Sequence, residues 1–208
     1  MRLKSALRRG VAAAVIAGIV VSSGIPAYAG TWDIANGDIT VKAGDEGTNN
    51  VKQGDNEFKK DEGETVITGE SEKNTVTIDT SEGDVDVTFD DLKIDVSGRD
   101  EGNAAVRVEG NGDVTIELDG KNELKGGGFN AGLEKDGHKS EGTLTIKDDN
   151  DTKGSLTAEG GNGGGAGGGA GIGGKHESSA GNIEITGGTI EAVGGEGAAG
   201  IGGGVYGQ

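Results

Sequence analysis

The feature that most constrains this chain is a sequence pattern that occurs three times between Asp113 and Gly204. Each copy begins with a strand of alternating apolar residues, continues with a second short strand and a glycine run, and ends in Ala-Gly-Leu or Ala-Gly-Ile. The copies span residues 113–133, 142–172 and 181–201. A period that is kept while its glycine insertions vary is typical of stacked repeats with loops on one side.

The apolar residues of the copies can be matched position by position. The second strands are matched at Leu124, Leu156 and Ile190, which are 32 and 34 residues apart. The ends of the copies are matched at Leu133, Ile172 and Ile201, which are 39 and 29 residues apart. DVDVTFDD from Asp84 resembles DVTIELDG from Asp113 at an offset of 29. The repeat therefore begins before the glycine-rich part of the chain.

Composition by itself places the chain near the border of intrinsic disorder. Glycine accounts for 45 of the 208 residues, and Leu, Ile, Val and Phe together make up about a fifth of them. The apolar residues nevertheless alternate with polar ones in runs bounded by Gly, Asp and Asn, as in VDVTFDDLKIDV. A flexible linker would not keep that alternation, so we expect a folded, all-β protein.

Residues 1–29 have the organisation of a signal peptide. A basic start, MRLKSALRRG, precedes an apolar stretch from Val11 to Val21 that is too short to span a bilayer, and Ala27-Tyr28-Ala29 forms an Ala-x-Ala cleavage signal. We expect a mature chain that begins at Gly30, is secreted or displayed at the cell surface, and does not insert into a membrane. An uncleaved anchor is the alternative interpretation.

The charge of the chain excludes some partners. Its formal net charge is −17, and removal of the basic signal peptide makes the remainder more acidic. Nucleic-acid binding requires a basic face and is excluded, and adhesion to anionic lipid is disfavoured. Cations and neutral or cation-bridged polymers remain as partners. We expect the protein to be a monomer.

Residues 30–64 are expected to form an N-terminal capping segment. The only tryptophan, Trp32, either packs over the open end of the first repeat or offers a stacking surface to a sugar. Ile39 and Val41 indicate a short strand, whereas Asn49 to Glu64 is polar and indicates a loop around Phe58. Residues 65–208 then form the repeat domain.

A fixed order of unlike strands favours a single-stranded, right-handed parallel β-helix with glycine-rich corners. In such a fold each strand lies above its counterpart at about 4.8 Å, so that inward apolar side chains form ladders. Antiparallel hairpins have no reason to repeat three unlike strands in order. An antiparallel β-sandwich is therefore the alternative fold.

The opening WDI...GDITV, the middle NTVTID and VTFDDLKIDV, and the unit NIEITGGTIEAVGGEGAAGIGGG resemble the carbohydrate-binding β-helix family of secreted and surface bacterial proteins. The resemblance covers essentially all of the chain after residue 29. It implies a right-handed parallel β-helix that binds calcium and plant-type or cell-wall polysaccharides, including acidic ones. The chain stops at VYGQ with no polar capping segment, so we expect the repeat domain to be truncated at its C-terminus.

Calcium is the cofactor that the resemblance implies, and carboxylates at strand ends are candidate ligands. Calcium prefers six to eight oxygen ligands. Asp90, Asp91 and Asp119 are expected at one corner of the repeat, and Asp148 and Asp149 at another. The alternative interpretation is that these carboxylates only form solvated faces that discourage edge pairing.

Three functions remain open from the sequence. The leading one is an exported, non-catalytic polysaccharide-binding module that uses a polar strand face, because the chain has few aromatic residues. The second is a structural stalk or adhesin segment, and the third is a polysaccharide lyase or hydrolase. No pair of carboxylates stands out for catalysis, Arg107 lies in an ordinary strand, and His138 and His176 are expected to be solvated, so we do not expect an enzyme.

Overall fold

The computed structural model describes residues 30–98, 102–138 and 141–207, so the expected signal peptide lies outside the described residues. The protein is all-β, with 49% of residues in strands and 3% in helices. Its two short 3-10 helices are η1 (Ile34–Asn36) and η2 (Asp45–Gly47). The strands are β1 (Thr31–Asp33), β2 (Ile39–Ala43), β3 (Asn49–Gln53), β4 (Lys59–Asp61), β5 (Val66–Ser71), β6 (Val76–Asp79), β7 (Val85–Asp95), β8 (Val106–Glu109), β9 (Val114–Lys125), β10 (Leu133–Lys135), β11 (Thr143–Lys147), β12 (Gly154–Glu159), β13 (Ile172–Gly173), β14 (Asn182–Ile185), β15 (Thr189–Val193) and β16 (Ile201–Gly202).

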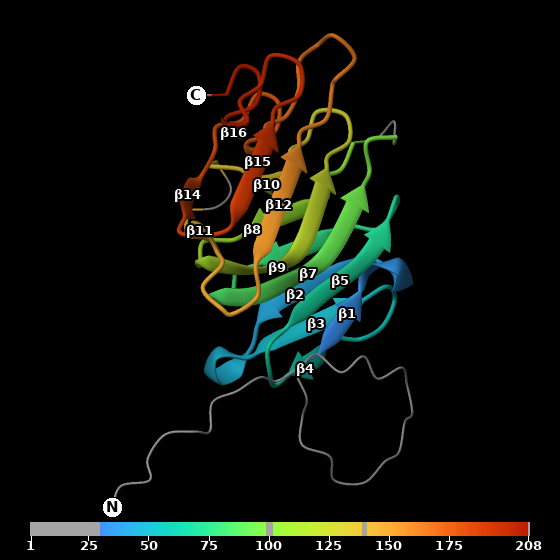
Figure 1. The fold of residues 1–208 in the computed structure, drawn as a ribbon, viewed down its shortest axis with the longest axis vertical. Coiled ribbons are helices and arrows are strands. Elements are labelled where there is room, and N and C mark those ends of the chain that lie inside the picture. Colours follow the sequence, from blue (N-terminus) through green and yellow to red (C-terminus); the bar gives the residue numbers. More distant parts are fainter. Residues whose placement is uncertain (1–29, 99–101, 139–140, 208) are drawn as a thin grey trace, which may run out of the picture.

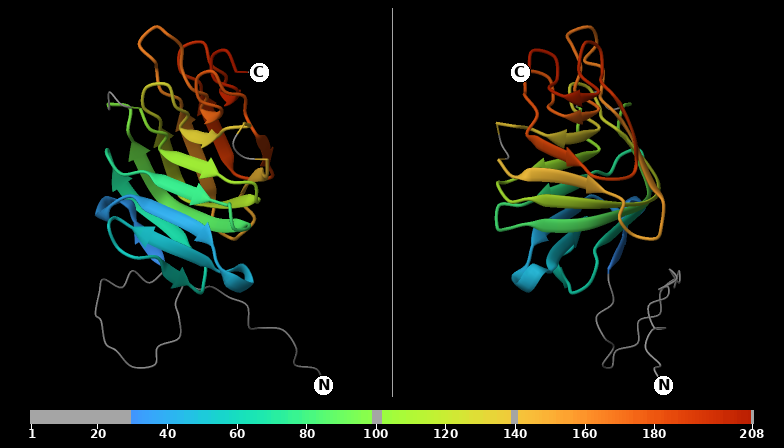
Figure 2. Two further views of the ribbon diagram at one scale, coloured as in Figure 1. Left: turned by 180° about the vertical axis from the view of Figure 1, so that it is seen from behind. Right: turned by 60° about the vertical axis from the view of Figure 1, so that its left-hand side comes forward.

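The strands form two eight-stranded sheets. The first has the order β1-β5-β7-β9-β11-β14, with β12 between β9 and β15, and the second has the order β16-β13-β10-β8-β6-β2-β3-β4. Figure 1 shows strands of the first sheet side by side along the long axis of the molecule, and the view from behind in Figure 2 shows those of the second. All pairs are parallel except β2 with β3 and β3 with β4. This predominantly parallel pairing rules out the antiparallel β-sandwich, which was the alternative fold.

The strand register confirms most of the expected matches. Leu133 pairs with Ile172, and Ile172 with Ile201. The segments that begin at Asp84 and Asp113 are also aligned as expected, since Val85 pairs with Val114.

One match was wrong. Leu124 lies opposite Ala158, whereas Leu156 lies opposite Asn122. The shift arises because β9 runs without a loop through both strand positions of its repeat, whereas β11 and β12 are joined by a loop. A comparison of apolar residues alone cannot show that difference.

The two long strands, β7 and β9, are irregular at the same place, but the apolar alternation changes phase only in β7, because the inward residues of β9 keep even numbers from Val114 to Leu124. In β7 the inward residues change from odd to even numbers between Phe89 and Leu92, and the pairing with β9 shifts between Asp90 and Lys93. Asp91 has φ +50° there, and Gly120 has φ +61° in β9. A bulge that adds one residue turns the strand and keeps apolar side chains inward on both sides of the bend.

The inward side chains form one continuous hydrophobic core between the sheets. The six apolar residues expected to point inward in β7 and just after it are all buried, namely Val85, Val87, Phe89, Leu92, Ile94 and Val96. The same holds for the inward positions of β9 and β11. Burial of one such side chain contributes about 1.5–3 kcal/mol, so a column of them holds successive strands together.

The polar segment from Asn49 to Glu64 is not only a loop. It contains β3, which pairs antiparallel with β2, and β4, which pairs antiparallel with β3, so that the second sheet is extended at its N-terminal end. The expectation was wrong because Val51 is the single buried apolar residue in β3. Trp32 is half-buried against the core, and its Nε1 donates to Asp61 Oδ2 at 3.0 Å.

The strands at the C-terminal end leave apolar side chains exposed. Ile185 in β14 is 39% exposed, although it pairs in register with the fully buried Ile146. Val193 in β15 and Ile201 in β16 are exposed as well. In the described chain β14, β15 and β16 pair on one side only, so Ile185 and Ile201, which are in the inward phase, reach solvent at this end. Val193 is exposed for another reason, since it pairs with Glu159 on the outward face.

Candidate functional site

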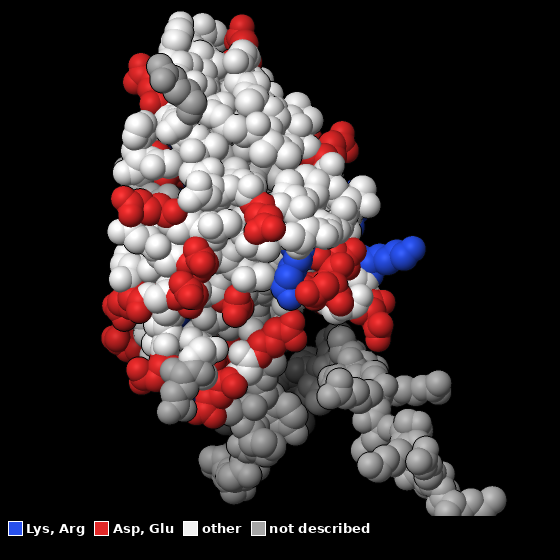
Figure 3. Space-filling model, turned by 90° about the vertical axis from the view of Figure 1, so that its left-hand side faces the viewer, with Lys and Arg blue, Asp and Glu red and all other residues white. Residues whose placement is uncertain are grey.

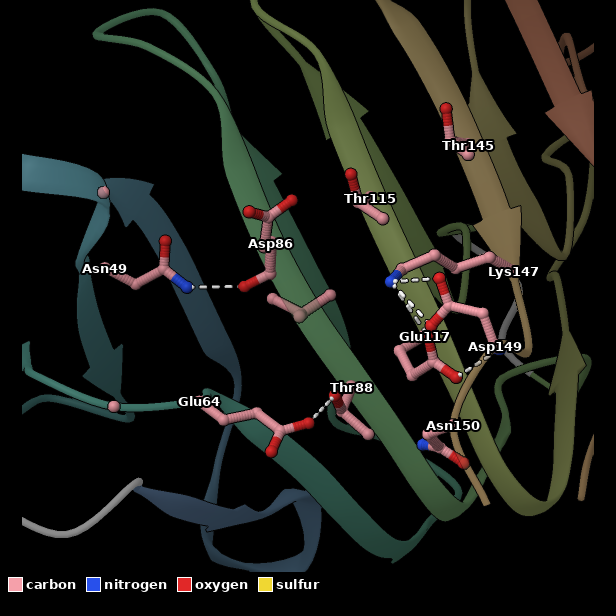
Figure 4. A pocket seen from close by; sticks show the side chains of 13 residues that line it. Asn49, Glu64, Asp86, Thr88, Thr115, Glu117, Thr145, Lys147, Asp149 and Asn150 are labelled. Atoms are coloured by element: carbon pink, nitrogen blue, oxygen red, sulfur yellow. Dashed lines mark hydrogen bonds and ion pairs between the residues drawn. The ribbon is translucent and has the colours of Figure 1, made fainter. Parts of the chain in front are cut away.

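A polar groove of about 700 Å³ crosses the outer face of the first sheet. Figure 4 shows that side chains from β7, β9 and β11 form its floor, while the N-terminal segment and the loop after β11 form its walls. These side chains alternate with the buried apolar residues along each strand, and outward orientation follows directly from the period of two. The same alternation that turns apolar side chains into the core therefore places the polar side chains between them in the groove.

The floor consists of two rows that run across the strands. In the first row Asp86 lies beside Thr115, and Thr115 beside Thr145. In the second row Thr88 lies beside Glu117, and Glu117 beside Lys147. Because neighbouring strands are about 4.8 Å apart, each row presents one polar group per strand at that spacing.

Lys147 is held in place by two carboxylates. Its Nζ lies 3.1 Å from Glu117 Oε2 and 3.0 Å from Asp149 Oδ1. The hydrogen bond with Asp149 raises the pKa of Lys147, and the same bond lowers the pKa of the Asp149 carboxyl. The backbone N–H of Asp149 also donates to Glu117 Oε1 at 3.1 Å. The three side chains thus form a fixed charged group at one end of the groove, as Figure 4 shows.

The other wall comes from a segment in which sequence reasoning found no functional residue. Asn49 is buried and donates from Nδ2 to Thr65 Oγ1 at 2.9 Å and to the backbone oxygen of Asp86 at 2.7 Å. Thr88 donates its hydroxyl hydrogen to Glu64 Oε1. The alternation in DVDVTFDD could have indicated that Asp86 and Thr88 point outward, but the contribution of Asn49 and Glu64 depends on tertiary contacts.

Three of the predicted metal ligands lie near one another. Asp90 is in register with Asp119 on the next strand. Burial raises the pKa of the Asp90 carboxyl, and the charges of Asp91 and Asp119 raise it further. The last two already have partners, since Asp91 Oδ1 accepts from the backbone N–H of Lys121 and Asp119 Oδ1 from Asn150 Nδ2.

The other two predicted ligands are apart from this corner. Asp149 is paired with Lys147 in the groove, and Asp148 precedes it at the start of the loop after β11. Among the side chains that the structure describes, no group of three His, Asp or Glu residues is arranged to hold a metal ion. The five carboxylates therefore do not form a single site in this structure.

Acidic side chains predominate on one face of the protein. In Figure 3 acidic side chains outnumber basic ones on the face that is turned to the viewer. Among the groove residues, Glu64, Asp86, Glu117 and Asp149 are acidic and only Lys147 is basic. The groove is thus a hydrogen-bonding surface with an excess of negative charge.

The remaining residues considered for chemistry lie in other places. The Arg107 guanidinium donates from Nε to Glu134 Oε1 at 3.0 Å on the second sheet, so the arginine is part of an ion pair. His138 is exposed as expected. His176 is not: its side chain is only 16% exposed because it packs between Phe129 and Tyr206. The sequence pattern did not indicate this cluster, because its three residues are far apart along the chain.

Comparisons with known proteins give no relative for this chain: no family model, no curated protein and no solved structure matches it. Within the described ranges, no helix has the length and apolar character needed to cross a membrane.

Proposed function

We propose that this chain is a right-handed, single-stranded parallel β-helix that acts as an exported, non-catalytic polysaccharide-binding module, with the polar groove as its binding surface. The observation that carries the proposal is the pair of in-register polar rows across β7, β9 and β11. The parallel order of the strands in both sheets supports the fold. The sequence of residues 1–29 supports export.

The groove suits a linear polymer rather than a compact small molecule. A row across three strands spans roughly 10 Å, about the length of two sugar units, and repeats its polar groups at the strand spacing. The hydroxyls of Thr115 and Thr145 can both donate and accept hydrogen bonds, as sugar hydroxyls require. The Lys147 side chain is already held by Glu117 and Asp149, so binding would cost less side-chain conformational entropy.

Calcium is the cofactor that we propose for acidic polymers. The groove carries more carboxylates than cations, so a polyuronate would be repelled unless a divalent cation bridges it. The corner with Asp90, Asp91 and Asp119 is the place where carboxylates crowd most closely among the predicted ligands.

The test is binding of the purified protein to neutral and acidic polysaccharides, with calcium and with a chelator. Thr115→Val combined with Thr145→Val should weaken binding by about 5- to 150-fold, since two hydrogen bonds at about 0.5–1.5 kcal/mol each are lost. The matched control is Thr157→Val, which changes an outward threonine of β12 that does not line the groove.

Each result has a definite meaning. Loss of acidic-polymer binding on chelation supports the calcium bridge, and Asp90→Asn with Asp119→Asn should then reproduce that loss. If no polysaccharide binds under either condition, the binding module is excluded and a structural spacer is the function that remains. Unsaturated or new reducing-end products would instead indicate a lyase or hydrolase.

A further inference from the structure

Three loops that are far apart in sequence bring three aromatic rings together in the C-terminal half of the protein. Phe129 lies between β9 and β10, His176 between β13 and β14, and Tyr206 after β16. The ring centroids of Phe129 and His176 are 5.1 Å apart, and those of His176 and Tyr206 are 5.7 Å apart. These separations are typical of tilted and edge-to-face aromatic pairs. The rings therefore form one contiguous aromatic cluster.

Backbone hydrogen bonds hold the three loops in this arrangement. The N–H of His176 donates to the carbonyl of Phe129 at 2.8 Å, and the N–H of Glu177 donates to the carbonyl of Val205 at 2.7 Å. Val205 in turn donates from its N–H to the carbonyl of Gly168 at 3.1 Å. The positions of the rings are thus set by the stacking of the loops.

The aromatic cluster lies directly on glycine backbone. A Cβ atom at Gly163 would be 2.1 Å from Cε1 of Phe129, and one at Gly167 would be 2.9 Å from Nδ1 of His176. Any larger residue at these two positions would displace a ring. The glycine run after β12 thus forms the floor of the cluster.

Two rings of the cluster remain open to solvent. Phe129 is 43% exposed and Tyr206 is 81% exposed. The other Phe and Trp side chains that the structure describes make contacts elsewhere. Phe89 is in the core, Trp32 packs against the core, and the Lys42 ammonium lies over the ring of Phe58. Phe129 and Tyr206, which both contact the His176 ring, are therefore the exposed rings of this cluster.

The backbone around the cluster is unusual as well. Glu177 has φ +60° and Tyr206 has φ +61°, and these are two of the three described non-glycine residues with positive φ. Such conformations cost about 1–3 kcal/mol each and persist where the surroundings impose them. In addition, Nδ1 of His176 is buried and has no hydrogen-bond partner within the described part of the chain.

We propose that Phe129, His176 and Tyr206 form a stacking site for a pyranose ring of a neutral glycan, separate from the groove. The ligand class rests on the proposed function, but the site shares no residue with the groove. The C–H face of a pyranose can cover one or two aromatic rings, and Phe129 and Tyr206 expose rings of that kind. A stable protein interface buries about 1,200–2,000 Å² in total and involves about 20–30 residues on each side, whereas this cluster exposes two rings.

The test uses the purified protein and soluble neutral hexasaccharides of glucose, xylose and mannose in calorimetric titrations. Tyr206→Ala should weaken binding of the preferred hexasaccharide by about 3- to 10-fold, and Phe129→Ala by a similar factor. Phe58→Ala is the matched control, because Phe58 is a similarly exposed ring outside the cluster. The imidazole NMR signals of His176 should shift when the sugar is added.

The outcomes separate this site from the groove. Weaker binding by Tyr206→Ala with wild-type binding by Phe58→Ala supports the stacking site. Wild-type affinity of Tyr206→Ala overturns it, whether or not the Thr115 and Thr145 variants lose polysaccharide binding. The stacking site is also overturned if none of the three hexasaccharides shifts the His176 signals. The same holds if these signals shift only when an aromatic peptide is added in a parallel titration.

Discussion

The side-chain oxygen of Asn122 accepts a hydrogen bond from the backbone N–H of Leu92 at 2.9 Å, inside the first sheet. The amide nitrogen of the same side chain donates to the carbonyls of Asp119 at 3.0 Å and Ser155 at 3.1 Å. Asn122 is fully buried. One asparagine thus joins β7, β9 and β12 where the long strands bend and their own ladder bonds are interrupted.

Replacement of Asn122 by alanine should lower the free energy of unfolding by about 2–4 kcal/mol, because one buried N–H and two partly buried carbonyls lose their partner. Urea denaturation measures the change. Asn182→Ala is the matched control, since its amide bonds to the carbonyl of Glu141 at an exposed position, and it should cost less than about 1 kcal/mol. Equal losses in the two variants would contradict a special role for Asn122.

Gly120 and Gly164 form a second matched pair, because both have a positive φ near +60°. A Cβ at Gly120 would be 2.3 Å from Oδ1 of Asp91, whereas nothing lies within 4 Å of one at Gly164. Each alanine substitution should cost roughly 1–2 kcal/mol for the left-handed conformation. Gly120→Ala should cost about 0.5–1.5 kcal/mol more, since Asp91 must release the Lys121 N–H. Denaturation curves that coincide would exclude this contact as a constraint.

Ile146 and Ile185 pair in register but differ in burial. Ile146→Ala should lower the free energy of unfolding by about 2–5 kcal/mol through loss of buried surface and a cavity. Ile185→Ala should cost less than about 1.5 kcal/mol, because 39% of this side chain is exposed. If Ile185→Ala were as damaging as Ile146→Ala, the C-terminal strands would have to be covered in solution.

Glu134 provides a pH test. It is 3% exposed, and burial raises the pKa of its carboxyl above the ordinary value of 4.5, while Arg107 opposes that rise. Between the unfolded and the raised folded pKa the folded state binds more protons than the unfolded state. The contribution of Glu134 to stability is therefore present below pH 4.5 and is lost as pH rises through its folded pKa.

Glu134→Gln keeps the size and the acceptor for Arg107 but does not titrate. The difference in unfolding free energy between the variant and the wild type should grow in favour of the variant as pH rises from about 4 to 7, by about 1.4 kcal/mol for each unit of raised pKa. Parallel pH profiles for the two proteins would show that the buried carboxyl has an ordinary pKa. Glu191→Gln, on the exposed strand β15, is the control.

Much of the fold could be predicted because alternation is a local property of the chain. Val85 and Phe89 identify the inward face of β7, and the similarity of the segments at Asp84 and Asp113 predicts their alignment. The outward face, and with it the threonine and carboxylate rows of the groove, follows from the same period of two.

The remaining features depend on contacts between distant residues. Strands β3 and β4 were missed because one buried valine and several backbone hydrogen bonds stabilise them. The match of Leu124 with Leu156 failed because loop geometry, not apolar character, decides the register. Calcium binding stays a prediction, as no described trio of ligating side chains tests it in either direction.

The sequence by itself determined that the chain is all-β and which apolar residues of β7, β9 and β11 lie inside. Those properties follow from side-chain polarity along a backbone whose faces alternate. Only the tertiary structure decided that Asn49 and Glu64 border the groove and that Phe129, His176 and Tyr206 meet. Positions tens of residues apart become neighbours only when strands stack in register, and that register is set by bulges, glycine turns and buried amides together.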